Sequence, residues 1–478
     1  MTASSSTKRI AIIGGGFSGV MTAVNVARMS KHPRHIILIN AKRPLGRGVA
    51  YGTRRPEHLL NVAARNMSAF PDLPDHFVQW LRTRSEFDTV PDLELRERFM
   101  PRMVFGDYLK SMMHHHLQGM GDEVTVTAEF VEGVAVDVEV NGSSGVVLLE
   151  DGTRIDADRV VLASGNEPPA ALPGAELLQD HGGWAGNPWL PWHENLPGDD
   201  GTIVILGTGL TTVDSIISLR AMGWLGRIHA VSRHGWLPEA HFRGIDYHDF
   251  PSPDVDLTNL GLEKLRALME EHCGKLRELG ANPAIVVDKM RPFTQQVWKN
   301  FSVEERLAFA KKDAARWNIM RHRIAPEIHA QVTSSQLTGQ LQVHSAYIER
   351  VETDGEKVKV CLEGGESLTG DLVINATGPQ TRFSSSKSLL LSKLMEKGLI
   401  SPDDMDMGIR ITDDHTAVTK DGTESEVLLA LGPLLRGTLW ETIAVPELRG
   451  QASQVAATLV GGSAAPAEDL SALVEFII

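Results

Sequence analysis

Two glycine-rich turns offer the clearest chemistry in this sequence, because a backbone without side chains can approach a phosphate closely. The first turn fits G-x-G-x-x-G and lies between an apolar run at 10–13 and a helical pattern at 20–29. Its members are Gly14, Gly16 and Gly19, with Phe17 and Ser18 between the last two. The first glycine allows a tight turn, the second lets a pyrophosphate approach, and the third lets the helix pack close to its strand. Free N–H groups at the helix start then bind phosphate, which predicts a dinucleotide site.

The second turn repeats this order of elements later in the chain. An apolar run at 202–206 precedes Gly207 and Gly209, and a helical pattern follows at 213–222. Thr212 stands where the third glycine would be, so this helix is expected to lie slightly further from its strand. Two such units in one chain predict two dinucleotide sites.

The strand after each turn ends at the residues that would meet the adenosine ribose. In the first unit this residue is Asn40, ~20 residues past the glycines, where Asp or Glu is usual. An amide accepts a ribose hydroxyl bond more weakly than a carboxylate does. In the second unit the strand at 228–231 ends at Ser232 and Arg233, and a hydroxyl beside a guanidinium suits a 2′-phosphate. The second site is therefore predicted to bind NADPH, which leaves the first for a tightly held FAD.

The segments between and after the two units predict loops and strands. Small residues at 46–52 predict an irregular loop, whose backbone could lie against a flat ligand. Alternating patterns at 124–149 and 341–361 predict antiparallel strands. Each pattern precedes a buried strand that ends in small residues, at 158–165 and 371–378. This similarity indicates a chain that crosses between two domains.

A helical block at about 253–330 interrupts the second unit and has no cofactor signature. Within it, Ser302 and Glu305 form a capping box, and the helix that they begin is predicted to run through residue 320. A last buried strand at 428–432 leads toward a helical pattern at 447–460. The positive N-terminus of that helix could face the electron-rich pyrimidine of a flavin.

Composition excludes several classes of protein. The net charge of −14 disfavours nucleic acid or an anionic membrane as a partner. The two cysteines, Cys273 and Cys361, are far apart and form neither a C-x-x-C pair nor a thiolate metal cluster. Three consecutive histidines at 114–116 point ~100° apart on a helix, so no metal site is predicted there. No apolar run approaches the ~18 residues of a membrane span, and the N-terminus lacks a signal-peptide core, so a cytoplasmic location is expected.

The predicted fold is α/β, with two Rossmann-like dinucleotide-binding domains for FAD and NADPH and a helical insertion. The first part of the FAD-binding domain is expected at 1–190. The NADPH-binding domain is expected at 198–345, with the insertion at about 253–330, and the second part of the FAD-binding domain at 346–478. The length of 478 residues suits two or three domains.

Several further motifs resemble those of a bacterial FAD/NAD(P)-binding protein family of flavoproteins with two dinucleotide-binding domains. These motifs lie at 46–51, 58–62, 67–70, 207–210, 232–235 and 440–449. Relatives with assigned chemistry resemble flavin-dependent N-hydroxylating monooxygenases, such as L-aspartate N-monooxygenase (nitrosuccinate synthase), and more distantly the ornithine and lysine hydroxylases. By position, the resemblance implies FAD contacts from Gly14, Gly16, Phe17, Ser18, Gly19, Asn40, Arg47, Gly48, Tyr51, Asn61 and Met67. It implies NADPH contacts from Gly207, Gly209, Ser232 and Arg233.

The resemblance implies an NADPH-dependent flavin monooxygenase that forms a C4a-hydroperoxyflavin and N-hydroxylates a small amine or amino acid. Its partners would be this substrate and O2, and a homo-oligomer is possible. Arg291 is the predicted clamp for a substrate carboxylate, with Lys289 assisting. The alternative is an NADPH-dependent flavin reductase or dehydrogenase that passes electrons to a quinone or protein acceptor. A non-catalytic FAD-binding sensor is a third hypothesis, disfavoured by the presence of two nucleotide sites.

Overall fold

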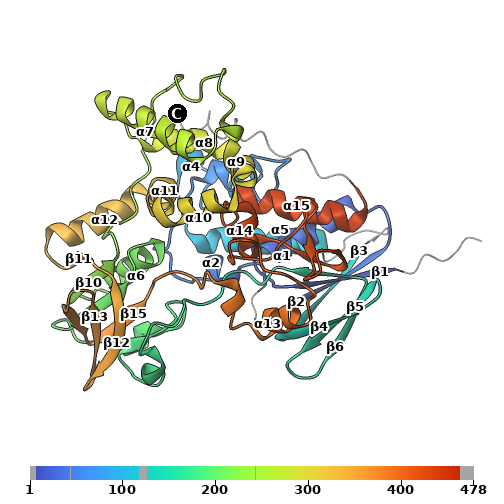
Figure 1. The fold of residues 1–478 in the computed structure, drawn as a ribbon, viewed down its shortest axis with the longest axis horizontal. Coiled ribbons are helices and arrows are strands. Elements are labelled where there is room, and N and C mark those ends of the chain that lie inside the picture. The colour runs from blue at the N-terminus through green and yellow to red at the C-terminus, as the bar shows by residue number, and fades with distance from the viewer. Residues whose placement is uncertain (1–6, 43–44, 118–125, 243, 463–478) are drawn as a thin grey trace, which may run out of the picture.

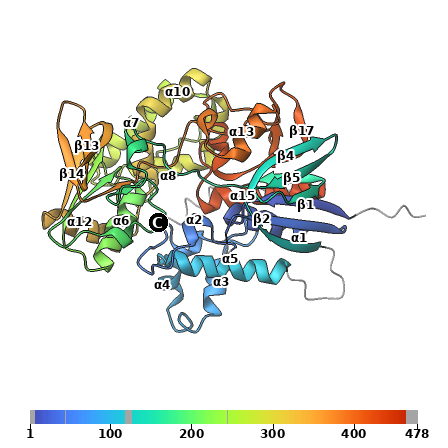
Figure 2. The same cartoon turned by 90° about the horizontal axis from the view of Figure 1, so that it is seen from below.

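The computed structural model describes residues 7–42, 45–117, 126–242 and 244–462. Within these residues the chain forms two mainly parallel β-sheets on opposite sides of the molecule (Figure 1), and the view from below in Figure 2 separates them in the same way. A block of helices lies at the top of Figure 1. The α/β fold with two dinucleotide-binding units and a helical insertion is therefore confirmed.

The first sheet begins with the N-terminal unit and receives its last strands from the C-terminal part of the chain. Its order is β16-β17-β7-β1-β2-β3. The strands are β1 Lys8–Ile13, β2 Arg34–Asn40, β3 Val126–Glu132, β7 Arg159–Leu162, β16 Thr416–Val418 and β17 Glu424–Ala430. The central strand β1 buries its four apolar residues, as expected for a parallel strand covered on both faces. Helix α1 (Phe17–Met29) joins β1 to β2 and packs against α5 (Arg102–Leu117) and α15 (Val445–Val460).

The alternating segment at 124–149 is only partly antiparallel. Strand β3 pairs in parallel with β2 along its whole length, which corrects the sequence prediction. It is the edge strand of the sheet, and the side chain of Glu129 is 48% exposed. An edge strand with one wet face alternates in the same way as a hairpin strand, so the pattern could not separate the two. Residue 124, where the alternation begins, lies outside the described residues.

The second sheet has the order β11-β10-β9-β15-β8. Its strands are β8 Trp184–Ala185, β9 Thr202–Leu206, β10 Arg227–Ser232, β11 Leu341–Ser345 and β15 Leu372–Asn375. Helices α6 (Leu210–Ala221) and α12 (Pro326–Leu337) pack together beside this sheet. Because β15 pairs with β9, the second unit continues to Asn375, past the predicted boundary at 345. Nothing in the residue pattern indicates which sheet the strand at 372–375 joins.

The strands β7 and β15 enter their sheets in the same way. Asp158 precedes β7, and its carboxylate accepts a hydrogen bond of 2.7 Å from the backbone N–H of Arg9. Asp371 precedes β15, and its carboxylate accepts a bond of 2.8 Å from the backbone N–H of Thr202. A three-stranded antiparallel sheet leads into each strand. The sheet before β7 consists of β4 Ala135–Asn141, β5 Ser144–Leu149 and β6 Arg154–Ala157. The sheet before β15 consists of β12 Ile348–Asp354, β13 Lys357–Leu362 and β14 Ser367–Gly370.

The helical block has a core of its own. Its helices are α7 Leu262–Glu278, α8 Ala284–Met290, α9 Thr294–Asn300, α10 Val303–Lys312 and α11 Ala314–Arg321. The capping box of Ser302 and Glu305 is present at the start of α10. The helix predicted through residue 320 is broken at Asp313, whose carboxylate accepts a 2.7 Å bond from Arg266 of α7. Asp313 therefore separates α10 from α11, and its ion pair links this break to α7.

The remaining helices are short. They are α2 Gly48–Tyr51, α3 His76–Arg82, α4 Asp92–Glu97, α13 Leu389–Glu396 and α14 Arg436–Leu439. Among the described residues, none of the helices combines the length and the apolar character that crossing a bilayer requires.

Candidate active site

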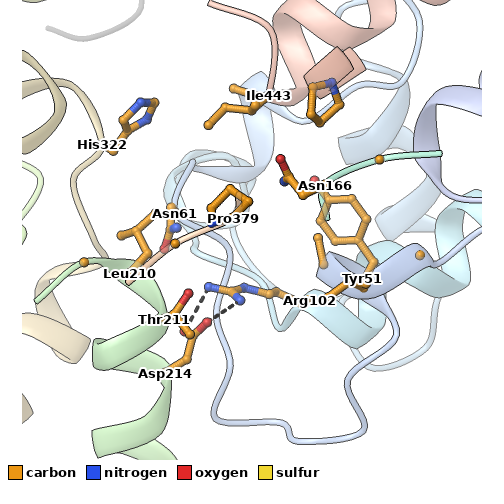
Figure 3. A pocket seen from close by; sticks show the side chains of 18 of the residues that line it. Tyr51, Asn61, Arg102, Asn166, Leu210, Thr211, Asp214, His322, Pro379 and Ile443 are labelled. Carbon is orange, nitrogen blue, oxygen red and sulfur yellow. Dashed lines mark hydrogen bonds and ion pairs between the residues drawn. The ribbon is translucent and has the colours of Figure 1, made fainter. Parts of the chain in front are cut away.

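Both glycine turns open on one cavity of about 2650 Å³ that extends from the first sheet to the second and to the helical block. Figure 3 shows side chains from these parts converging on it. Most of the predicted site residues line it: Gly14, Gly16, Phe17, Ser18, Asn40, Arg47, Gly48, Tyr51, Asn61, Met67, Gly209, Arg233 and Arg291. Four others are not among the described lining residues: Gly19, Gly207, Ser232 and Lys289.

The glycines of the first turn have different surroundings. A Cβ on Gly14 would lie 2.1 Å from the carbonyl oxygen of Ala163, and φ there is +120°. A Cβ on Gly19 would lie 1.9 Å from the carbonyl oxygen of Gly14, so this glycine permits close packing of α1 on its turn. A Cβ on Gly16 would have the Cα of Gly48 as its nearest neighbour beyond the adjacent residues, at 3.6 Å. The chain itself therefore needs glycine at 14 and 19, whereas the space at Gly16 faces the cavity.

The second turn repeats this division of roles. A Cβ on Gly207 would lie 2.3 Å from the carbonyl oxygen of Ala376, whereas a Cβ on Gly209 would meet nothing within 4 Å. Thr212, at the position of the third glycine, is fully buried, and its hydroxyl donates a 2.9 Å hydrogen bond to the carbonyl oxygen of Gly207. The hydroxyl thus links helix to turn where the first unit uses close contact.

Both helices start without a capping side chain. Gly16 is the N-cap of α1 and Gly209 the N-cap of α6, and neither position has a side-chain hydrogen bond. Phe17 and Ser18 of α1, and Leu210 of α6, line the cavity. The N–H groups of a first helical turn have no partner within the helix and carry its positive dipole end. These two helix starts fit the pyrophosphates of two dinucleotides.

Asn40, the predicted ribose contact, is bonded to its own turn. Its Oδ1 accepts a 2.9 Å hydrogen bond from the N–H of Gly15, and its Nδ2 donates to the carbonyl oxygen of Lys42. The amide therefore fixes the shape of the glycine turn, which a carboxylate could do at only one of these two contacts. One lone pair of Oδ1 remains for a ligand.

The segment at 46–52 forms one helical turn, α2, instead of the loop that its glycines predicted. Arg47 before it is ion-paired with Asp107. The ring of Tyr51 packs edge-on against that of Phe105, with 4.7 Å between the ring centroids. Burial raises the pKa of the Tyr51 phenol to about 12. Tyr51 is thus a neutral wall of the cavity (Figure 3).

Two contacts join the first unit to helix α6 at the edge of the cavity. Arg102 donates bonds of 2.6 and 2.9 Å to the two carboxylate oxygens of Asp214, as the dashed lines in Figure 3 show. His58 lies 2.8 Å from the hydroxyl of Ser218, and its pKa is lowered by burial, although Asp214 opposes this shift. Sequence reasoning missed this junction, because nothing in the spacing relates residues of two separate domains.

The second unit presents Arg233 to the cavity as an exposed side chain. Its neighbour Ser232 is held by the hydroxyl of Thr208 at 2.8 Å and accepts a 3.1 Å bond from the N–H of Gly235. Of the two residues predicted to read a 2′-phosphate, Arg233 therefore faces the cavity and Ser232 stabilises the turn.

Arg291 lies on the cavity wall but has an internal partner. Its guanidinium donates to Glu447 at 3.1 Å, and Arg321 donates to the same oxygen at 3.2 Å. Burial alone would raise the pKa of Glu447, yet these two arginines lower it overall. The predicted assistant, Lys289, lies on the same helical block but is not among the residues that line the cavity. Nearby, burial lowers the pKa of His322 to about 4, which makes this cavity imidazole neutral at pH 7.

A protein family described as FAD-NAD(P)-binding matches residues 11–167 of this chain. The match covers the first glycine turn and strand β7, so this part of the chain is a FAD/NAD(P)-binding region. None of the curated protein sequences matches the chain significantly.

Solved structures share the fold over nearly the whole chain. Ornithine N-hydroxylase from Kutzneria sp. 744, in complex with reduced FAD, NADP+ and L-ornithine, has a TM-score of 0.61 at 14% identity, covering 98% of this chain and 99% of that one. The FAD-bound cadaverine monooxygenase of Erwinia amylovora has a TM-score of 0.65 at 11% identity, covering 96% of both. Bacillithiol disulfide reductase from Bacillus cereus has a TM-score of 0.52 at 16% identity, covering 95% and 99%. The chain therefore has the fold of two-dinucleotide-domain flavoenzymes.

Among the described residues, no group of three or more His, Cys, Asp and Glu side chains is arranged to hold a metal ion.

Proposed function

We propose that this protein is a FAD- and NADPH-dependent monooxygenase that transfers oxygen from O2 to the nitrogen of a small amine or amino acid. The observation that carries the proposal is the opening of two uncapped helix starts, at Gly16 and Gly209, on one cavity. One cavity lets two dinucleotides bring their reactive rings together. The fold shared with an ornithine N-hydroxylase and a cadaverine monooxygenase supports the choice of reaction.

The residues of this chain would hold, orient and enclose the reactants. The start of α1 would hold the FAD pyrophosphate, and the start of α6 would hold that of NADPH. Met67 and Tyr51 would form part of the flavin side of the cavity, and the start of α15, at Val445, would present its dipole there. FAD, when bound, would supply the redox chemistry, which is acceptance of a hydride from NADPH and activation of O2. Exclusion of water from the cavity favours the neutral form of a substrate amine, which is the nucleophile that oxygen transfer needs.

The test is a product analysis on the purified, flavin-containing protein. Amines and amino acids are supplied with NADPH in aerated buffer, and hydroxylamine products are counted against NADPH consumed. We expect at least one compound to yield N-oxygenated product with close to one product per NADPH. Absence of N-oxygenated product from all of them, with NADPH-driven reduction of a quinone under anaerobic conditions, would establish the reductase instead.

The reductase alternative has one specific support, the fold shared with a disulfide reductase. A disulfide-exchange version is disfavoured by the cysteines of this chain. Cys273 lies in α7 and Cys361 in β13, and both are buried and free. Burial also raises the pKa of both thiols, which lowers the fraction of reactive thiolate.

Replacing Arg233 with alanine is expected to weaken the preference for NADPH. The exposed guanidinium is the proposed partner of the 2′-phosphate, and a charged hydrogen-bonded contact of this kind contributes about 10- to 100-fold in affinity. The KM for NADPH should rise by that factor, while the KM for NADH, which lacks the phosphate, should not change. An unchanged ratio of the two KM values would remove Arg233 from the site. Arg382→Ala is a matched control, since it alters another exposed arginine of the cavity rim.

A further inference from the structure

The buried arginines of the cavity are neutralised by carboxylates of the chain itself. Arg291 and Arg321 share Glu447, and Arg321 also lies 3.7 Å from Glu441. Nη2 of Arg323 donates to both carboxylate oxygens of Asp288, at 2.8 and 2.7 Å. A buried arginine that loses its carboxylate partner is left as an uncompensated charge, which is costly, so these arginines are expected to keep their partners. They are poorly placed to bind a ligand carboxylate.

Arg436 differs from these arginines. It is the first residue of α14, is half-buried and lines the same cavity. Within the described part of the chain its side chain makes neither a hydrogen bond nor an ion pair, and burial lowers its pKa with no carboxylate acting against the shift. The other described cavity cations without an acidic partner, Lys42, Arg54 and Arg233, are exposed.

Three carboxylates lie close to this part of the wall, and each is directed to other groups. Glu167 accepts from the hydroxyl of Ser386 and the N–H of Lys387. Asp406 accepts from the N–H and hydroxyl of Ser384. Asp403, under Gly437, accepts from the N–H groups of Met405 and Met407. Arg436 is therefore left as a desolvated cation although acids stand near it.

We propose that Arg436 binds an anionic group of the ligand, and that this group is the carboxylate of an amino-acid substrate. The inference rests on the proposed function and replaces Arg291 by Arg436 as the carboxylate-binding residue. The cofactor phosphates already have the two helix starts and Arg233 as their donors. Among the described cavity residues, Arg436 is then the half-buried cation that remains for another anion. Its planar guanidinium can bind a carboxylate with two parallel hydrogen bonds.

The test measures equilibrium binding to the oxidised, FAD-containing protein by calorimetry, so it needs no turnover. The probes are α-amino acids and, for each one that binds, the amine that lacks the carboxylate. In Arg436→Gln we expect the affinity for the amino acid to fall by about 100-fold, the loss of a charged hydrogen-bonded pair, with the amine unaffected. Arg436→Lys should retain part of the affinity, since it keeps the charge without the planar fork.

Arg382→Gln is the matched control, because Arg382 lines the same cavity but is 75% exposed, and its substitution should leave binding unchanged. Equal affinities of wild type and Arg436→Gln for the amino acid would overturn the inference, as would failure of the wild type to bind any α-amino acid. A lower FAD content or a higher KM for NADPH in Arg436→Gln alone would also overturn it, by assigning Arg436 to a cofactor. Carboxylate-dependent binding without a hydroxylamine product would refute the proposed reaction and leave this inference standing.

Discussion

Gly16→Ala is expected to fold normally and to be purified without flavin, whereas Gly209→Ala should keep its flavin and lose NADPH-dependent reduction. A methyl group at either position meets no atom of the chain within 3.4 Å, so the fold has room for it. The φ angle is −82° at Gly16 and −84° at Gly209, which alanine adopts without strain. The added methyl group would instead occupy the space through which a pyrophosphate reaches the helix N–H groups.

The size of the effect follows from the contacts that are lost. Each charge-assisted hydrogen bond to a phosphate is worth roughly 1.5–3 kcal/mol, so displacement from two of them costs about 100-fold or more in affinity. FAD content is measured from the absorbance of the purified protein, and NADPH affinity from the rate of flavin reduction. Each variant is the control for the other, because they alter equivalent positions in the two units.

Gly14→Ala provides the contrasting case. Its methyl group would lie 2.1 Å from the carbonyl oxygen of Ala163 at a φ of +120°, so this variant should lose the fold together with the flavin. If Gly16→Ala retains stoichiometric FAD, the start of α1 does not hold the pyrophosphate. If it unfolds as Gly14→Ala does, the space at Gly16 is needed by the chain itself.

The sequence was sufficient where local spacing determines structure. The glycine turns, their flanking strands and the two segments that begin at Asp158 and Asp371 could be placed because each depends on residues adjacent in the chain. The difference at Thr212 was also visible, although its hydrogen bond to Gly207 was not. The parallel pairing of β3 and of β11 was missed, because an edge strand and a hairpin strand share the same alternation.

The walls of the cavity could not be predicted in the same way. Whether Arg291 or Arg436 is free depends on where Glu447 and the acids near α14 point, and these residues are distant in sequence. Asn40 is a similar case, since its bond to Gly15 uses an oxygen that the sequence assigned to a ligand. Cations are readily found from sequence, but their partners are set by tertiary packing.

Asp214→Ala is expected to lower the free energy of unfolding by about 3–5 kcal/mol, the usual cost of removing one partner from a buried ion pair. The side chains of Arg102 and Asp214 are only 10% and 14% exposed. Arg102 also donates from Nε to the carbonyl oxygen of Leu59, so its guanidinium cannot turn to water without breaking a second bond. The variant leaves this cation buried between the two units, at the edge of the cavity.

Urea unfolding of the flavin-containing protein, followed by flavin fluorescence, measures this loss. Glu94→Ala is the control, because it breaks an exposed ion pair in which the side chains of Arg98 and Glu94 are 45% and 54% exposed. It should lower the free energy of unfolding by no more than about 1 kcal/mol. The double variant Arg102→Met and Asp214→Leu should recover most of the stability, because it removes both charges. A loss in Asp214→Ala as small as that in Glu94→Ala would mean that the junction is wet. Flavin reduction by NADPH should slow in Asp214→Ala more than in the double variant, since an unpaired Arg102 draws water into the junction on which the approach of the two dinucleotides depends.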